Sequence, residues 1–127
     1  MPTFGATLDG FVRADDLDVT RTISGVPTGQ TLTDAWLRVN AANGTTLVFE
    51  KHITGTLVAG QGQIQDAGAS GVGVVRFELV GGTTGDTTLL TPELAHVYDI
   101  QVKTSAGKIY TPENGTMKCH EQIVLQV

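Results

Sequence analysis

The feature that most constrains this chain is a period-two alternation of apolar and polar residues, in short runs that glycines separate. In residues 71–80, Val75, Phe77 and Leu79 alternate with polar residues, and residues 97–104 repeat the pattern. Alternation of this period places the apolar residues on one face of a strand. The 127 residues include 16 glycines, which divide the chain about every ten residues. This spacing predicts an all-β fold, and we expect an immunoglobulin-like antiparallel β-sandwich.

The remaining runs complete the expected sandwich. Further strands are expected over residues 18–23, 31–40, 45–53, 108–111 and 116–127. Asn43-Gly44 and Asn114-Gly115 are pairs that favour tight turns between strands. Residues 55–73 are rich in Gly and Gln and predict an exposed connection with one brief edge strand, whereas residues 91–94 predict a helical turn. The expected inward residues of the strands at 31–40, 45–53 and 116–127 are Ala35, Leu37, Val39, Leu47, Phe49, Ile53, Met117, Cys119, Ile123 and Leu125.

One tyrosine is expected to define the fold. Leu94 is followed four residues later by Tyr98, at the entry to the penultimate strand. This spacing resembles the tyrosine corner of immunoglobulin-like sandwiches, in which the phenol hydroxyl bonds to backbone upstream. We therefore predict a hydrogen bond from the Tyr98 hydroxyl to the preceding backbone.

The first 16 residues stand apart from the alternating pattern. They contain Phe4, Leu8 and Phe11 but show no sustained alternation and no turn signature. We therefore divide the chain into an N-terminal arm, residues 1–16, and a sandwich domain, residues 17–127. The arm is expected to dock on a neighbouring subunit, and a chain that begins near Asp18 is expected to fold without it.

Composition and charge argue against several classes of partner. The net charge is −5, and the eight basic residues are scattered singly, which disfavours nucleic acid as the main partner. No run approaches the roughly 18 apolar residues of a membrane span, and the N-terminus does not resemble a signal peptide. Charged residues make up only 17% of the chain, which fits a surface that is buried on assembly.

No catalytic or metal-binding pattern is expected. His52, His96 and His120 are dispersed, and the lone Cys119 is expected to be a buried thiol. The chain has no Gly-x-Ser-x-Gly elbow, so we predict a protein that is not an enzyme and needs no cofactor or metal. Trp36, with Asp34 and Arg38 on the same face, is either a platform for a sugar ring or a protein-contact hot spot.

Several segments together resemble a known family. They are Asp34-Ala35-Trp36-Leu37-Arg38-Val39, Gly62-Gln63-Ile64-Gln65-Asp66-Ala67-Gly68, Tyr98-Asp99-Ile100-Gln101-Val102-Lys103-Thr104 and Gly107-Lys108-Ile109-Tyr110-Thr111. In this order they resemble the immunoglobulin-like N-terminal domain of the upper baseplate proteins of tailed siphophages. The resemblance covers about residues 31 to 117.

The resemblance implies a structural protein of the phage virion. In the family, further segments that trimerise and hold receptor-binding proteins follow this domain, whereas this sequence ends at Val127. We therefore expect a small accessory of the capsid (decoration or cement), head-tail junction, tail or baseplate. It would be made in the host cytoplasm and would contact other virion proteins in many copies or as a homo-oligomer. The expected interface residues are Phe4, Leu8, Phe11, Trp36, Gln61, Gln63 and Gln65. The alternative is a carbohydrate-binding module around Trp36.

Overall fold

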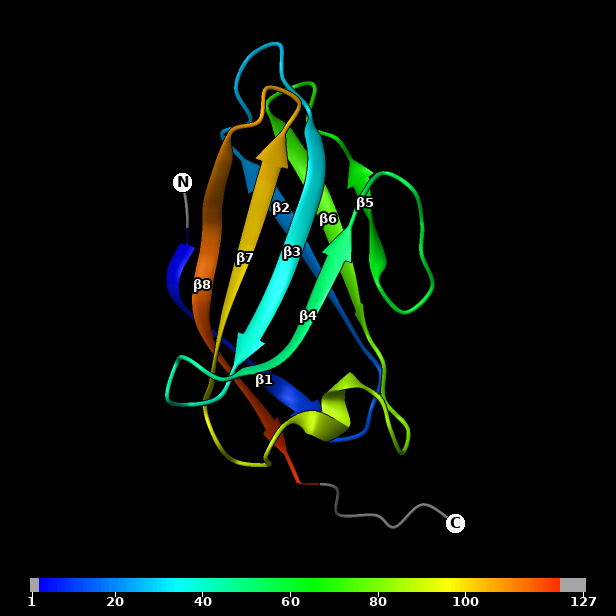
Figure 1. The fold of residues 1–127 in the computed structure, drawn as a ribbon, viewed down its shortest axis with the longest axis vertical. Coiled ribbons are helices and arrows are strands. Elements are labelled where there is room, and N and C mark those ends of the chain that lie inside the picture. Colours follow the sequence, from blue (N-terminus) through cyan, green and yellow to red (C-terminus); the bar gives the residue numbers. More distant parts are fainter. Residues whose placement is uncertain (1–2, 122–127) are drawn as a thin grey trace.

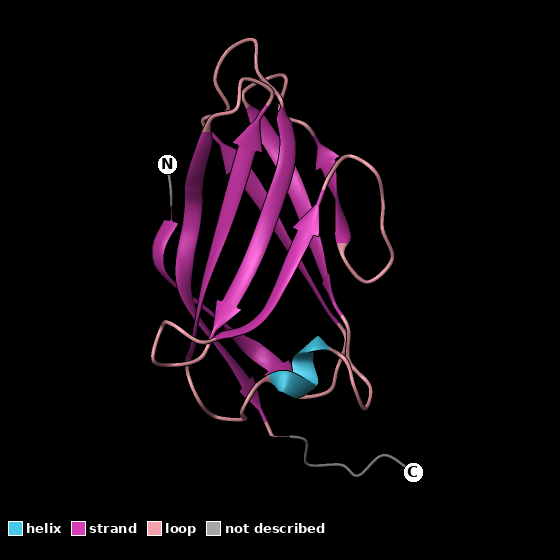
Figure 2. Ribbon diagram, viewed as in Figure 1, coloured by secondary structure: helices cyan, strands magenta, loops and turns pink. Residues whose placement is uncertain are grey.

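Two β-sheets form the fold. The computed structural model describes the backbone of residues 3–121 and the side chains of residues 7–121. Within this part, eight strands and one short 3-10 helix follow each other along the chain (Figures 1 and 2). The strands are β1 (Thr3–Val12), β2 (Leu17–Ser24), β3 (Leu32–Asn40), β4 (Leu47–Ile53), β5 (Gly62–Asp66), β6 (Val72–Leu79), β7 (His96–Thr104) and β8 (Ile109–His120). The larger sheet has the order β1-β8-β7-β3-β4, and the smaller sheet has the order β2-β6-β5.

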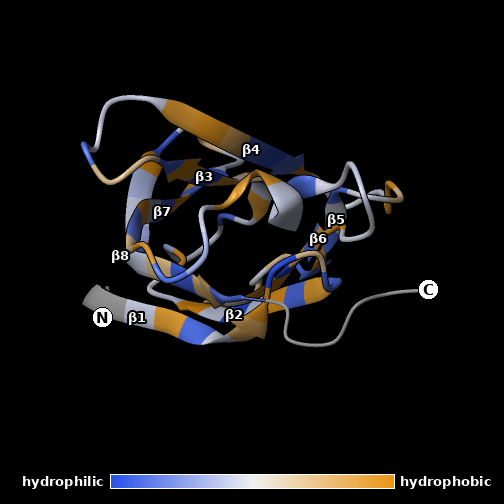
Figure 3. Ribbon diagram, turned by 90° about the horizontal axis from the view of Figure 1, so that it is seen from below, coloured by the Kyte–Doolittle hydropathy of each residue, from blue (hydrophilic) through white to orange (hydrophobic). Residues whose placement is uncertain are grey.

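The predicted all-β sandwich is confirmed. Seen along the strands, the two sheets face each other around one interior (Figure 3). That interior holds the apolar residues that alternation placed inward, because every second side chain of a strand points to the same face. Residues with at most 1% of their surface exposed include Ala35, Leu37, Val39, Ile53, Val75, Phe77, Leu79, Tyr98, Ile100, Val102, Met117 and Cys119. Ile123 and Leu125, also expected inward, lie outside the described residues.

The predicted separate arm is wrong. Residues 3–12 form β1, which pairs in parallel with β8 at the edge of the larger sheet. Leu8 lies beside Met117 and Phe11 beside Cys119, and both arm residues are buried in the domain's own core. The pairing register shifts between Leu8 and Phe11, where Gly10 adopts φ +83°. This bulge turns two residues of odd spacing to the same face, so that the strand lacks the alternation expected of it.

The β3–β4 hairpin differs from the predicted tight turn. Residues 41–46 form a wider loop, in which the Asn43 side chain accepts hydrogen bonds from the backbone N–H groups of Thr45 and Thr46. A register shift follows Val39, so that Asn40 pairs with Leu47. Leu47 is therefore 54% exposed rather than inward.

The last two predicted strands form one. β8 runs without a break through Asn114-Gly115, which was expected to be a turn. Ladder pairing with β7 joins Asp99 to Asn114 and Tyr98 to Gly115, and β1 pairs with the other side of β8. With neighbours on both sides, the extended form of this Asn-Gly pair satisfies its backbone hydrogen bonds better than a turn would.

The helical turn also lies elsewhere. A 3-10 helix spans Asp86–Leu89, within a segment expected to be a loop. Thr91 to Leu94 instead form a turn closed by the Leu94 N–H and the Thr91 carbonyl, with Glu93 at φ +63°. A residue with positive φ cannot continue a right-handed helix, so the predicted helical turn at residues 91–94 is wrong.

The Gly/Gln-rich connection contains the predicted brief edge strand. β5 pairs with β6, and Ile64 is buried in the core. At Gly62, φ is +124°, and a side chain there would collide with the Arg76 carbonyl, so glycine is required. Within residues 3–121, no helix is long and apolar enough to cross a membrane.

Candidate functional site on the outer face of the larger sheet

An ion pair in the interior links the two sheets beneath the outer face of the larger sheet. Arg21 of β2 donates from Nε to both carboxylate oxygens of Glu113 in β8, at 2.9 and 3.1 Å. The Tyr98 hydroxyl donates to Glu113 Oε2 at 2.5 Å. We call these three residues the interlayer clamp. The predicted tyrosine corner is therefore wrong, because the phenol bonds to a buried carboxylate, a stronger acceptor than a backbone carbonyl.

The clamp alters the chemistry of the tyrosine. Burial raises the pKa of Tyr98 to about 12, and the neighbouring negative charge of Glu113 acts in the same direction. Sequence reasoning missed this cluster, although the signal was present. Arg21 lies between Val19 and Ile23 on the inward face of β2, and a charged residue at such a position requires a buried partner.

Trp36 lies on the opposite, outward face of the larger sheet. Its ring stacks on the ring of His52 in β4, with centroids 4.9 Å apart and planes inclined by 6°. His52 Nε2 is 2.8 Å from Asp34 Oδ2, and this contact lowers the pKa of the Asp34 carboxyl. One face of the indole is therefore covered by His52. A sugar at Trp36 would have to use the other face or the ring edge.

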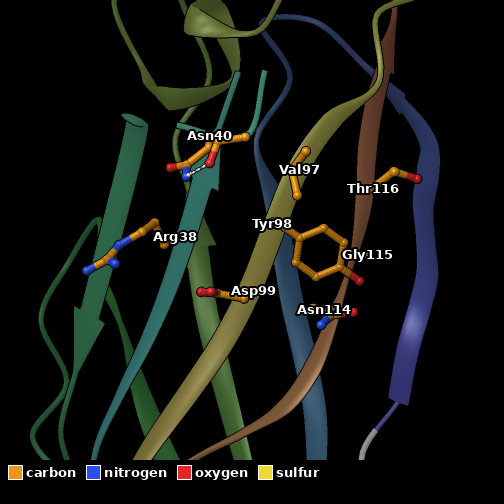
Figure 4. Close-up of a pocket in the computed structure, with 9 residues that line it drawn as sticks. Arg38, Asn40, Val97, Tyr98, Asp99, Asn114, Gly115 and Thr116 are labelled. Carbon is orange, nitrogen blue, oxygen red and sulfur yellow. Dashed lines mark hydrogen bonds between the residues drawn. The ribbon is translucent and has the colours of Figure 1, made fainter. Parts of the chain in front are cut away.

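A polar depression lies on the same face, and its lining includes Arg38, two residues along β3 from Trp36 (Figure 4). Its volume is about 410 Å³, and it lies between the β3–β4 hairpin and strands β7 and β8. Four polar residues form a row of cross-strand neighbours here: Glu50 on β4, Arg38 on β3, Asp99 on β7 and Asn114 on β8. Arg38 Nε donates to Glu50 Oε2 at 2.7 Å. The row brings side chains from four strands to one place.

Two acceptors at the depression, Asp99 and Asn40 Oδ1, receive no hydrogen bond from the described residues. Burial raises the pKa of the Asp99 carboxyl, whereas the positive charge of Arg38 lowers this pKa and the negative charge of Glu50 raises it. No described residue donates a hydrogen bond to the Asp99 carboxyl. The Asn40 Nδ2 group donates to the Gly44 carbonyl at 2.9 Å, but Asn40 Oδ1 is buried without a partner among the described residues. Sequence reasoning missed Asp99 and Asn40, because their proximity depends on the register of three strands.

The predicted interface residues do not form one site. Leu8 and Phe11 are 9% and 6% exposed and belong to the core, so both predictions of an interface role are wrong. The side chain of Phe4 lies outside the described residues. Trp36 occupies the outer face of the larger sheet, where its ring stacks on His52, and the backbone N–H of His52 donates to Gln61 just before β5.

The three predicted glutamines lie in and before β5. Gln61 Oε1 accepts the backbone N–H of His52, and Gln63 Nε2 donates to the Gly55 carbonyl. Both side chains thus have partners within the chain, whereas Gln65 is exposed. Beside them, Leu57 and Val58 are 55% and 48% exposed. The exposed apolar side chains of this connection therefore offer a partner a larger surface than its glutamines do.

A buried lysine was also missed. Lys51 of β4 is only 4% exposed and pairs with Asp86 at the start of the 3-10 helix. Its Nζ also donates to the Gly60 carbonyl at 2.6 Å, and Asp86 accepts the Val80 N–H at 2.9 Å. This pair joins β4, the connection to β5 and the loop after β6 at one end of the sandwich.

The described part of the chain contains no group of three or more His, Cys, Asp or Glu side chains placed to hold a metal ion. No protein-family model matches the chain, and no curated protein matches it.

Proposed function

We propose that the protein is a non-enzymatic, immunoglobulin-like structural component of a tailed-phage virion, which docks on neighbouring virion proteins. The strand order supports the subtype. Strands β8-β7-β3 face β2-β6-β5, which corresponds to the order G-F-C facing B-E-D in immunoglobulin sandwiches. The virion assignment rests on the resemblance of residues 31–117 to upper baseplate proteins.

The observation that carries docking is the exposed apolar surface of the connection into β5. We call Leu57, Val58 and Val80 the connection patch. They are 55%, 48% and 41% exposed. Val80 approaches this connection at Gly60, and Val58 pairs with Gly62 at the start of the edge strand. Exposed apolar side chains that gather in one place give a partner hydrophobic contacts.

Co-sedimentation with purified phage particles tests this proposal. The double variant Leu57→Ser/Val58→Ser removes most of the connection patch and should sharply reduce the fraction of protein that sediments with particles. Ile109→Ser is the matched control, because Ile109 is 54% exposed but lies on β8. Failure of the wild-type chain to sediment, together with its absence from virion mass spectra, would refute the virion role. Equal loss in both variants would refute the role of the connection patch.

A further inference from the structure

We propose that the polar depression on the outer face of the larger sheet binds a short stretch of a neutral glycan. We call it the Asp99 depression, formed by Arg38, Asn40, Val97, Asp99, Asn114 and Thr116. This role goes beyond the docking function above and does not depend on it. The site also differs from the predicted sugar platform, since its centre is Asp99 rather than Trp36.

The polar groups of the depression define the ligand. Asp99 is partly exposed and accepts no hydrogen bond from a described residue, so a ligand can supply an O–H or N–H group to it. Arg38 uses Nε for Glu50, and its exposed guanidinium still carries donors that need acceptors. A hydroxyl group both donates and accepts, so neighbouring hydroxyls on a sugar ring can serve both kinds of group at once.

The charges favour a neutral ligand. Arg38 and Glu50 compensate each other, which leaves Asp99 as the uncompensated charge of the row. A carboxylate or phosphate on the ligand would be repelled by Asp99. A lysine or arginine side chain from a partner protein would pair with Asp99, but it would face the guanidinium of Arg38 and offer it no acceptor.

The size and walls of the depression agree with a sugar. Its volume of about 410 Å³ falls within the roughly 300–1,000 Å³ of small-molecule sites. Val97 is 39% exposed and lies opposite both Asn40 and Thr116, where it offers an apolar wall to the C–H face of a ring. Trp36 lies two residues from Arg38 on the same face, roughly 7 Å along the strand, so a longer glycan would reach it.

Titration of the ¹⁵N-labelled chain with neutral oligosaccharides of glucose, galactose, mannose and N-acetylglucosamine tests this inference. The amide signals of Val97, Asp99 and Asn114 should shift in a saturable way with at least one of them. Asp99→Ala should weaken that binding about tenfold or more, the usual cost of losing a charge-assisted hydrogen bond. Asp18→Ala is the matched control, because Asp18 is an exposed carboxylate of β2 in the smaller sheet and its loss should leave the affinity unchanged.

Other outcomes contradict the inference in distinct ways. No saturable shift with any neutral sugar, or shifts that map away from the depression, would overturn it. Loss of binding in Trp36→Ala but not in Asp99→Ala would place the site at the indole. Tighter binding of sialyllactose or of a lysine-rich peptide would overturn the choice of a neutral ligand. Asp99→Ala should still sediment with particles, so failure of the glycan site and failure of docking remain distinguishable.

Discussion

Substitution of Phe11 by alanine tests the placement of β1 in the core. Phe11 is 6% exposed and lies beside Cys119 of β8, so its ring fills the interior at the edge of the larger sheet. Removal of a buried phenylalanine ring costs about 3–5 kcal/mol, and we expect about 3 kcal/mol at this edge position. Over the 127 residues, the entropy of unfolding is about 0.27 kcal/mol per kelvin, so the melting temperature should fall by about 11 °C.

Chemical denaturation and differential scanning calorimetry measure this loss, with Ile109→Ala as the control. Ile109 is 54% exposed on β8, the strand with which β1 pairs, so its substitution should lower the free energy of unfolding by no more than about 0.5 kcal/mol. If Phe11→Ala and Ile109→Ala unfold at the same temperature, β1 does not belong to the core. Residues 1–16 would then be the separable arm that the sequence pattern suggested.

Three further predictions concern ionisable side chains. Tyr98→Phe removes a hydrogen bond of the interlayer clamp and should cost about 1–3 kcal/mol in urea denaturation. The folded state raises the pKa of Tyr98 from 10.0 to about 12, so the stability that the neutral phenol contributes is complete below pH 10 and is lost between pH 10 and 12. The free energy of unfolding of the wild type should therefore fall more than that of Tyr98→Phe over this range. Asp86→Ala strands the buried Lys51 and should cost about 3–5 kcal/mol, whereas Lys51→Met should cost far less; equal costs would contradict the buried pair. The contact with His52 lowers the pKa of Asp34, so the ionised Asp34 carboxylate stabilises the fold above pH 3.8, and this stability is lost as the pH falls through the folded pKa. NMR of the Asp34 carboxyl should show its pKa return toward 3.8 in His52→Ala.

Sequence alternation alone determined four strands of the sandwich, of which β3, β6 and β7 are central and β2 is an edge strand. β2, β3, β6 and β7 form where it predicted them, with the expected faces inward. Each of these strands pairs with at least one neighbour and has one buried face, so a slip of one residue would expose all its apolar side chains. The hydrophobic pattern was therefore sufficient for them, and it also predicted the brief edge strand around Ile64.

Tertiary structure decided the two edges of the larger sheet and the candidate site. Bulges beside Gly10 and at the β3–β4 hairpin break the period of two, so the pattern could not reveal that Phe11 is inward or that Leu47 is outward. Asn114-Gly115 has strong turn propensity, yet pairing with strands on both sides of β8 holds it extended.

The Asp99 depression arises for a related reason. Asp99 and Arg38 lie 61 positions apart, and only the register of β3 against β7 makes them neighbours. Local preferences determine which residues form strands and which faces they bury. The register between strands distant in sequence determines which polar side chains meet, and that register is fixed by packing in the folded chain.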